Sequence, residues 1–380
     1  MALTPPALPT PLQISRFGTL TSLGATEAGF AALIEGRSGF GPGPDWVPRE
    51  QPVACVRSPV GDGARTVALA LAALGGLDVD PRGLAVIVAT TTSDMLAGEL
   101  AIEAWVKGGK PARPVDYMWS HLAHWPAVAV ADHLGATGPA LVVSTACTSG
   151  TVAIGVAADL VRAGRCERAL VVGADALCRT TIHGFRSLSA YSTTRCRPMD
   201  KARDGMAIGE AAAWLLLEPR TASPTPGGAR FSLIGVATAT DAYHLTAPEP
   251  RGSGVLRAIA GATRGLDPAH IDHVNAHATG TEANDAAEAA ALSRAAPRAA
   301  ISATKGASGH TLGAAGVLEA VWLLQAMEAG VIPPVVGLED PVDGVDVAGV
   351  VRSREQTVGV SVNLAFGGHN AAVAFRKEAR

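Results

Sequence analysis

Two stretches of the chain follow the same order of elements. Residues 140–164 read ALVVSTACTSGTVAIGVAADLVRAG, and residues 299–330 read AAISATKGASGHTLGAAGVLEAVWLLQAMEAG. Each begins with a short apolar run, passes through a turn of small residues that carries a reactive side chain, and continues as a small-residue helix ending in Ala-Gly. The pattern predicts an internally duplicated strand–helix unit, and therefore two similar halves with alternating α and β elements.

Other short runs extend this α/β pattern. Residues 84–90, 140–145 and 168–174 are apolar or β-branched along almost their whole length, which is typical of strands buried on both faces of a parallel sheet. HVNAHATGT at 273–281 follows the form of VIVATTTSD at 86–94. The second half therefore repeats more than one unit of the first.

The boundary between the halves is predicted from composition. Residues 210–218 are predicted as a strand, and the Pro- and Gly-rich residues 221–229 as a linker. We expect an N-terminal half at 1–218, opened by a loose lead-in at 1–13, and a C-terminal half at 230–380. A chain of 380 residues, 48% of them hydrophobic, is long enough for two packed halves.

Charge and cysteine usage exclude several classes of protein. The net charge is -3 and no dense Lys/Arg block occurs, so nucleic acid is not an expected partner. No run of 18 uninterrupted apolar residues predicts a membrane span, and no basic segment followed by an apolar stretch opens the chain. An odd number of cysteines favours a reduced, cytoplasmic setting over a disulfide framework. They are Cys55, Cys147, Cys166, Cys178 and Cys196.

Cys147 occupies the turn of the first repeat, and three roles are open to it: a packing residue, a metal ligand or a nucleophile. The chain has no CxxC spacing, so we expect no metal site. A thiol at a strand-to-helix turn lies near free backbone N–H groups and the positive end of the helix, which predicts a lowered pKa. Small neighbours leave room for a substrate. The other four cysteines lack this setting and are predicted to be structural.

Two histidines lie at comparable turns of the second half. His277 is in NAHATGT and His310 is in KGASGH, each after a predicted buried strand. Such residues are either hydrogen-bonded structural histidines or partners of the thiol where strand ends meet. Lys305, unless it is a solvated loop charge, needs an anionic partner, and Glu319 on the following helix is the candidate. AFGG at 365–368 offers backbone N–H groups suited to an oxyanion hole.

Four ordered motifs, TACTSG, NAHATGT, KGASGHTLGAAG and FGGHN, resemble those of the β-ketoacyl-acyl carrier protein synthases of the I/II branch. The resemblance extends over nearly the whole chain, including residues 17–41, 197–218 and 241–250. It implies the thiolase fold, in which two similar five-stranded halves form α-β-α-β-α layers. It also implies a dimer, acyl carrier protein as a partner, and substrates carried on phosphopantetheine without a further cofactor.

The resemblance also implies a role for individual residues. Cys147 would accept the acyl chain as a thioester, and His277 and His310 would stabilise the enolate formed when malonyl-carrier protein loses carbon dioxide. The remaining implied residues lie around these three. They are Lys305 and Glu319 as the supporting charged pair, the N–H groups of Cys147 and Phe366 as the oxyanion hole, Phe366 as the gatekeeper, Thr279 and Thr281 for the pantetheine arm, and Arg186 for carrier-protein docking.

Neighbouring families are separated by the same motifs. A thiolase would use a second cysteine near the C-terminus, but no cysteine follows Cys196. The synthase III branch pairs its His with Asn, whereas KGASGH supplies a second His in this chain. The alternative is a non-catalytic chain-length-factor-like subunit of a heterodimer, but those usually lose the cysteine.

Two stretches depart from the family pattern. Leu364 and Ala365 replace a usual Phe and Gly before the gatekeeper. The aromatic-rich stretch at 117–125 departs near the expected dimer interface. It is predicted either to reshape the acyl pocket or to pack in the dimer. The pathway, whether fatty acid, polyketide or aryl polyene, stays open.

Overall fold

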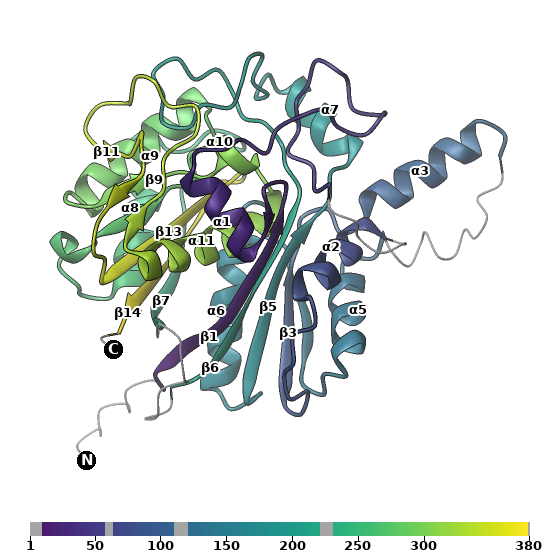
Figure 1. The fold of residues 1–380 in the computed structure, drawn as a ribbon, viewed down its shortest axis with the longest axis horizontal. Helices are drawn as coiled ribbons and strands as arrows, with labels where there is room; N and C mark the ends of the chain where they lie inside the picture. The colour runs from purple at the N-terminus through teal and green to yellow at the C-terminus, as the bar shows by residue number, and fades with distance from the viewer. Residues whose placement is uncertain (1–9, 58–63, 110–120, 221–230, 379–380) are drawn as a thin grey trace.

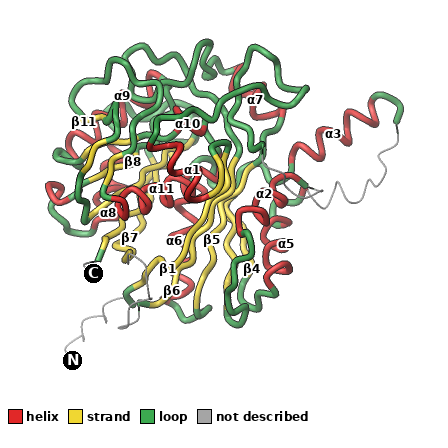
Figure 2. The backbone as a smooth tube through the Cα atoms, viewed as in Figure 1, coloured by secondary structure: helices red, strands yellow, loops and turns green. Residues whose placement is uncertain are grey.

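The fold is a layered α/β arrangement in two halves (Figures 1 and 2). The computed structural model describes residues 10–57, 64–109, 121–220 and 231–378. The predicted linker at 221–229 therefore lies outside the described residues, as do residues 1–9 of the predicted lead-in. The prediction of a loose segment is wrong for Leu12 and Gln13, which already belong to the first strand.

The main strands share one mixed sheet that runs in the order β11-β9-β8-β13-β14-β7-β1-β6-β5-β3-β4. Those of the first half are β1 (Leu12–Thr21), β3 (Leu84–Ala89), β4 (Ala140–Val143), β5 (Arg168–Asp175) and β6 (Ala211–Pro219). Those of the second half are β7 (Phe231–Thr240), β8 (His273–Asn275), β9 (Ala300–Ser302), β11 (Asp346–Val347), β13 (Val358–Ala365) and β14 (His369–Lys377).

The duplication predicted from the sequence is present in the topology. From the centre outward, β1-β6-β5-β3-β4 corresponds to β7-β14-β13-β8-β9. In both series two antiparallel pairings are followed by two parallel ones. Among the described residues, the two series of strands pair with each other through Leu12–Ile14 of β1 and Phe231–Leu233 of β7. The expected correspondences of β3 with β8 and of β4 with β9 are thereby confirmed.

Helices form three layers around the two sets of strands. On the outside, α2 (Arg65–Leu74) and α5 (Trp125–Leu134) cover the first set, while α8 (Ser253–Thr263) and α9 (Glu282–Ala295) cover the second. In the middle, α6 (Ser149–Arg162) and α11 (Ala315–Ala329) pack on each other and contact strands of both sets. This gives the five layers that the family resemblance implies.

The small residues of the middle helices allow their backbones to approach closely. A Cβ atom at Gly150 would lie 2.5 Å from the backbone nitrogen of Val317, and one at Gly316 would lie 2.4 Å from that of Thr151. Helix α11 is apolar all round and buried along most of its length, as expected for a core helix. The stretch Leu312–Ala329 is long and apolar enough to cross a membrane, but it is 89% buried inside the fold.

Strand β4 differs from its prediction as a fully buried strand. It is the last strand of the sheet, and its first two residues are exposed, with Leu141 39% accessible. The apolar composition of this strand indicates that its side chains favour burial, but it does not indicate which element buries them. An edge strand also presents unpaired backbone N–H and C=O groups.

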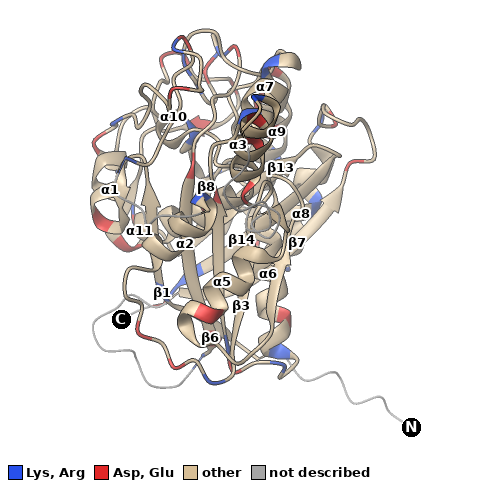
Figure 3. Ribbon diagram, turned by 90° about the vertical axis from the view of Figure 1, so that its right-hand side faces the viewer, with Lys and Arg blue, Asp and Glu red and all other residues tan. Residues whose placement is uncertain are grey.

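Two helices flank the region above the first set of strands. Helix α3 (Met95–Val106) extends away from the body, and α7 (Arg179–Ser187) lies at its base (Figure 1). The Glu99 carboxylate accepts the backbone N–H groups of Arg179 and Thr180 at 2.9 and 2.8 Å, and Arg179 pairs with Glu103 at 2.7 Å. The charged residues of α3 are acidic and those of α7 are arginines, and both helices lie close together in Figure 3.

Candidate functional site

A cavity of about 380 Å³ lies where the carboxyl ends of strands from both halves meet. Its wall brings together side chains that are far apart in the sequence. They are Cys147 from the first half and His277, Thr279, Thr281, His310 and Phe366 from the second. Phe185 and Leu188, from the end of α7, contribute to the wall. Six of the predicted site residues therefore line one cavity.

Cys147 lies in the tight turn between β4 and α6. Ala146 before it has a positive φ of 52°, and the Ser149 hydroxyl bridges the turn by donating to the Ala146 carbonyl and accepting the Thr145 N–H at 2.8 Å. The predicted position next to a helix N-terminus is therefore present. The predicted lowering of the thiol pKa is wrong, because burial raises it to about 12 and the nearby Lys305 charge only partly opposes this.

His310 is the side chain that reaches the thiol. Its Nε2 lies 3.0 Å from the Cys147 sulfur, while its Nδ1 accepts the backbone N–H of Leu312 at 3.3 Å. Since a backbone N–H can only donate, Nδ1 is the unprotonated nitrogen of the neutral ring and Nε2 carries the proton. The imidazole thus directs an N–H donor at the sulfur.

His277 is held in the same tautomer by a different donor. The Lys305 ammonium lies 3.2 Å from its Nδ1, which leaves the proton on Nε2. The two imidazole rings stand edge to face, with centroids 5.2 Å apart. The backbone N–H groups of His277 and Ala278 donate to the Glu288 carboxylate at 2.6 and 2.7 Å, which anchors the turn after β8.

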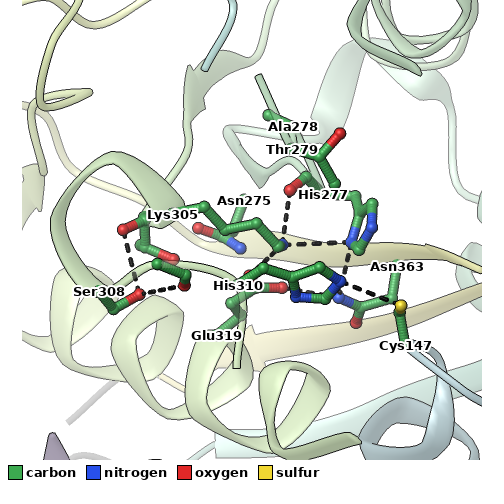
Figure 4. A network of polar contacts seen from close by, with 12 residues as sticks. Cys147, Asn275, His277, Ala278, Thr279, Lys305, Ser308, His310, Glu319 and Asn363 are labelled. Carbon is green, nitrogen blue, oxygen red and sulfur yellow. Dashed lines mark hydrogen bonds and ion pairs between the residues drawn. The ribbon is translucent and has the colours of Figure 1, made fainter. Parts of the chain in front are cut away.

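Lys305 and Glu319 form a buried ion pair behind the histidines (Figure 4). Their side chains are 1% and 2% accessible, and Lys305 Nζ also donates to the His277 carbonyl. The other Glu319 oxygen accepts the Asn363 amide at 2.7 Å. The expected contact between Lys305 and Glu319 is present, and the solvated alternative for Lys305 is excluded.

Burial keeps both histidines neutral. It lowers the pKa of His277 and of His310 well below the usual value, and the Lys305 charge lowers both further. Burial also raises the pKa of Glu319, against the effect of Lys305. At neutral pH the site therefore presents two uncharged N–H donors beside a thiol.

Two backbone N–H groups are available near the sulfur. Within the described part of the chain, neither the Cys147 nor the Phe366 N–H donates a hydrogen bond to another residue. The turn after Phe366 needs glycine, since Gly367 and Gly368 have φ values of 84° and 73°. The Phe366 ring rests on Phe185, with centroids 5.7 Å apart, at the mouth of the cavity.

The remaining predicted residues lie along the entrance. Thr279 and Thr281 face the cavity with their hydroxyls 2.9 Å apart. Arg186, next to Phe185, is outside the cavity wall and 40% accessible, 4.0 Å from Glu50. In the aromatic-rich stretch, Trp125 begins α5 and does not line the cavity, whereas Tyr117 and Trp119 lie outside the described residues.

Sequence reasoning missed two residues that fix the histidines. Asn363 lies on β13, where its amide donates to Glu319 and its oxygen accepts the Thr151 hydroxyl at 2.5 Å. A polar residue within the apolar run VGVSVNLA was the available signal. The sequence signal for Glu288 was weaker, because it is one of several acidic residues in an alanine-rich helix. Burial raises the pKa of the Glu288 carboxyl to about 8.

The same three side chains offer donor atoms for a metal. The ligand atoms of Cys147, His277 and His310 lie within 4.8 Å of one another. The Lys305 ammonium beside His277 opposes a second cation at this point. The expectation that the site holds no metal stays a prediction.

Comparisons of sequence place the chain among known proteins. Residues 65–223 match the N-terminal domain of β-ketoacyl synthases, and residues 231–339 match the C-terminal domain. A 3-oxoacyl-[acyl-carrier-protein] synthase 2 of Synechocystis is 38% identical over 264 residues, which are 65% of this chain and 64% of that protein. The matched region thus spans slightly less than two thirds of this curated relative.

Solved structures extend the likeness to the full length. A chain of the complex between the ketosynthase ApeO and its chain length factor ApeC from Xenorhabdus doucetiae has a TM-score of 0.87 with 29% identity and full coverage of both chains. The ishigamide ketosynthase/chain length factor has a TM-score of 0.89 with 27% identity, covering 98% of this chain and 100% of that one. Together with the two domain matches and the cavity of one cysteine and two histidines, these likenesses show that the chain belongs to the β-ketoacyl synthase family.

Proposed function

We propose that the protein is a β-ketoacyl-acyl carrier protein synthase. It joins an acyl group held on Cys147 to the two-carbon unit of a malonyl-carrier protein, with loss of carbon dioxide. The observation that carries this proposal is the common tautomer of the two histidines. Each has its Nδ1 occupied by a donor, so two neutral Nε2–H groups are available beside the thiol.

The first half-reaction is the transfer of an acyl group to the thiol. The Cys147 sulfur attacks the acyl-carrier thioester, its proton passes to the departing pantetheine sulfur, and the carrier leaves as the free thiol. The thiol is a weak nucleophile at its raised pKa. The His310 N–H at 3.0 Å stabilises the developing thiolate, and the N–H groups of Cys147 and Phe366 bind the oxyanion.

The second half-reaction forms the carbon–carbon bond. The malonyl thioester loses carbon dioxide, and the electron pair left behind is delocalised onto the thioester oxygen as an enolate. His277 and His310 donate to this oxygen without being strong acids that would protonate the carbanion. The enolate carbon attacks the Cys147 thioester, and the cysteine sulfur leaves as the thiolate, which then takes up a proton.

Acylation of Cys147 is the direct test. Incubation with a carrier protein that bears an acyl group should add the mass of one acyl group to the chain. Peptide mapping should place that group on Cys147. The Cys147→Ala variant should gain no mass and should lose condensation activity completely, since no thioester can form.

The other cysteines provide the control. Cys178→Ala removes a buried thiol that does not line the cavity, and it should acylate like the wild type. An acyl group that appears equally on Cys55, Cys166, Cys178 or Cys196 would contradict the proposal.

Acyl carrier protein is the proposed partner at the cavity mouth. Arg186 is an accessible cation one residue from Phe185, where an acidic carrier would deliver its pantetheine arm past Thr279 and Thr281. Arg186→Ala should raise the KM for carrier-bound substrate about fivefold at low salt and should weaken its salt dependence. Steady-state kinetics at two ionic strengths provide the measurement.

The control for this docking variant is Arg82→Ala. Arg82 is an exposed arginine just before β3, at the opposite end of that strand from the cavity, and its loss should leave KM unchanged. Docking at Arg186 would be refuted if Arg186→Ala impaired a short pantetheine substrate as strongly as the carrier-bound one.

A second ketosynthase-like subunit is the other proposed partner, either a copy of this chain or a related one. Two exposed apolar surfaces support this: the edge strand β4 with Leu141, and α3 with Leu100, Ile102, Trp105 and Val106. The two solved relatives compared above are both described with a chain length factor. The non-catalytic alternative is disfavoured because a subunit without chemistry would have no need of the Cys147–His310 contact.

The cellular setting is part of the same proposal. Five free thiols are consistent with a soluble enzyme of the cytoplasm. We expect no resident cofactor, because phosphopantetheine on the carrier brings the acyl groups. The pathway is one that builds a fatty acid, a polyketide or an aryl polyene.

A further inference from the structure

One buried carboxylate connects the two turns that carry the thiol and its histidine. Asp175 is the last residue of β5 and has no accessible surface. Its two oxygens accept hydrogen bonds from three backbone N–H groups and two hydroxyls, and no Lys or Arg of the described residues forms an ion pair with it. The donors are Thr90 Oγ1 at 2.6 Å, the N–H groups of Thr91 at 2.8 Å, Thr92 at 3.0 Å and Gly313 at 2.7 Å, and Thr92 Oγ1 at 2.9 Å.

The first connection leads to the nucleophile. Thr91 donates its backbone N–H to Asp175 Oδ2, and its hydroxyl donates to the carbonyl of Ala146 at 3.2 Å. Ala146 immediately precedes Cys147 and has a positive φ, so its peptide orientation sets the direction of the thiol. The carboxylate therefore holds the Cys147 turn through a single intermediate residue.

The second connection leads to the histidine. Gly313 donates its N–H to the same Asp175 Oδ2, and the preceding residue, Leu312, donates its N–H to His310 Nδ1. A Cβ atom at Gly313 would lie 2.6 Å from the Thr91 nitrogen and 2.8 Å from Asp175 Oδ2. The two turns are thus packed directly against each other at this oxygen.

We propose that Asp175 is a positioning residue that fixes the distance and orientation between the Cys147 sulfur and His310 Nε2. Oδ2 acts as a common anchor, because one oxygen holds the backbone on both sides of that 3.0 Å contact. Asp175 does not line the cavity and touches no reacting atom, so its hydrogen bonds act through the two turns, while, besides burial, its charge contributes to the raised pKa of the Cys147 thiol. This role in acyl transfer rests on the proposed synthase function.

The substitution that removes the anchor is Asp175→Ala. Without the carboxylate the two turns relax independently, and acyl transfer to Cys147 should slow about a hundredfold, the size of effect that a displacement of about 1 Å produces in an organised site. Asp175→Asn should restore part of this rate. Its oxygen can face Thr91 and Gly313 while its amide donates to the hydroxyls of Thr90 and Thr92, but the Thr92 backbone N–H loses its acceptor.

A matched control separates positioning from stability. Asp200 is also fully buried and accepts the backbone N–H groups of Ala202, Glu339 and Asp340 at 2.8, 2.6 and 2.8 Å, away from the cavity. Asp200→Ala should lower the Tm as Asp175→Ala does, but should leave the acyl-transfer rate of the folded protein unchanged.

The decisive measurement is the ¹⁵N spectrum of histidine-labelled protein, recorded beside the acyl-transfer rate and the Tm. Asp175→Ala should shift the His310 ring resonances, which report the contact with sulfur, and Asp200→Ala should not. A lowered Tm with unchanged His310 resonances and unchanged acyl transfer in Asp175→Ala would overturn the proposal. If the wild type transfers no acyl group, the synthase function fails, while the His310 spectrum still decides the positioning role.

A second variant keeps the test intact if Asp175→Ala does not fold. Thr91→Val removes only the hydroxyl that reaches Ala146 and leaves the Thr91 N–H on the carboxylate. It should slow acyl transfer about tenfold, the effect of one lost hydrogen bond. A wild-type rate in Thr91→Val would overturn the connection from Asp175 to Cys147.

Discussion

Replacing His277 with alanine is expected to slow carbon dioxide release from malonyl-carrier protein about a hundred- to a thousandfold, the cost of removing one oxyanion donor. Acylation of Cys147 should be largely retained in this variant. The reason is geometric, because among the described histidines it is His310 whose Nε2 lies within hydrogen-bond distance of the sulfur, at 3.0 Å. His310→Ala should therefore impair both steps, whereas His277→Ala impairs one.

The two steps can be measured on the same preparations. Release of labelled carbon dioxide reports decarboxylation, and intact mass reports acylation. His183→Ala, which changes a histidine on α7 that does not line the cavity, is the control and should leave both rates unchanged. Equal loss of acylation in His277→Ala and His310→Ala would contradict the assignment of separate roles.

The substitution Lys305→Met should destabilise the fold by about 3–5 kcal/mol. It leaves the Glu319 carboxylate buried with no cation, and the methionine chain fills most of the vacated volume, so the loss comes mainly from the unpaired charge. Part of the loss is recovered by protonation of Glu319, whose pKa burial already raises. Urea denaturation followed by circular dichroism measures the change in free energy of unfolding.

A double variant distinguishes stability from chemistry. Lys305→Met with Glu319→Gln removes both charges and should regain much of the lost stability, whereas decarboxylation should stay low because no ammonium holds His277 Nδ1. Lys201→Met is the matched control. This accessible lysine pairs with Asp340 and Asp343 at the surface, and its loss should leave the free energy of unfolding nearly unchanged. A double variant as active as the wild type would show that Lys305 does not hold the tautomer.

The sequence predicted those parts of the site that depend on local chain geometry. Cys147, His277 and His310 could be located because each follows a short apolar strand and precedes a turn of small residues. Their convergence followed from the duplication, since equivalent strand ends of two like halves meet. The pairing of Lys305 with Glu319 could be anticipated because a buried ammonium requires an anion.

What the sequence did not reveal depends on contacts between distant segments. Asp175 accepts hydrogen bonds from Thr90–Thr92, more than 80 positions earlier in the chain, and from Gly313, 138 positions later. Its place at the end of a strand does not indicate these contacts. The same is true of Asn363, whose side chain is bonded to Thr151 and Glu319, 212 and 44 positions earlier. The pKa of Cys147 was predicted in the wrong direction because helix proximity can be read from the sequence, whereas the depth of burial cannot. The exposure of β4 depends on strand order, which apolar composition does not determine.

The close contact of α6 with α11 has a consequence for how the molecule unfolds. Each helix comes from one half of the chain, yet each covers strands of the other half. A fragment ending near residue 220 would keep α6 but lack the helix against which Gly150 packs, and the complementary fragment would lack the partner of Gly316. Neither fragment could complete an apolar core by itself. The two halves are therefore one cooperative unit, and folding requires the whole chain.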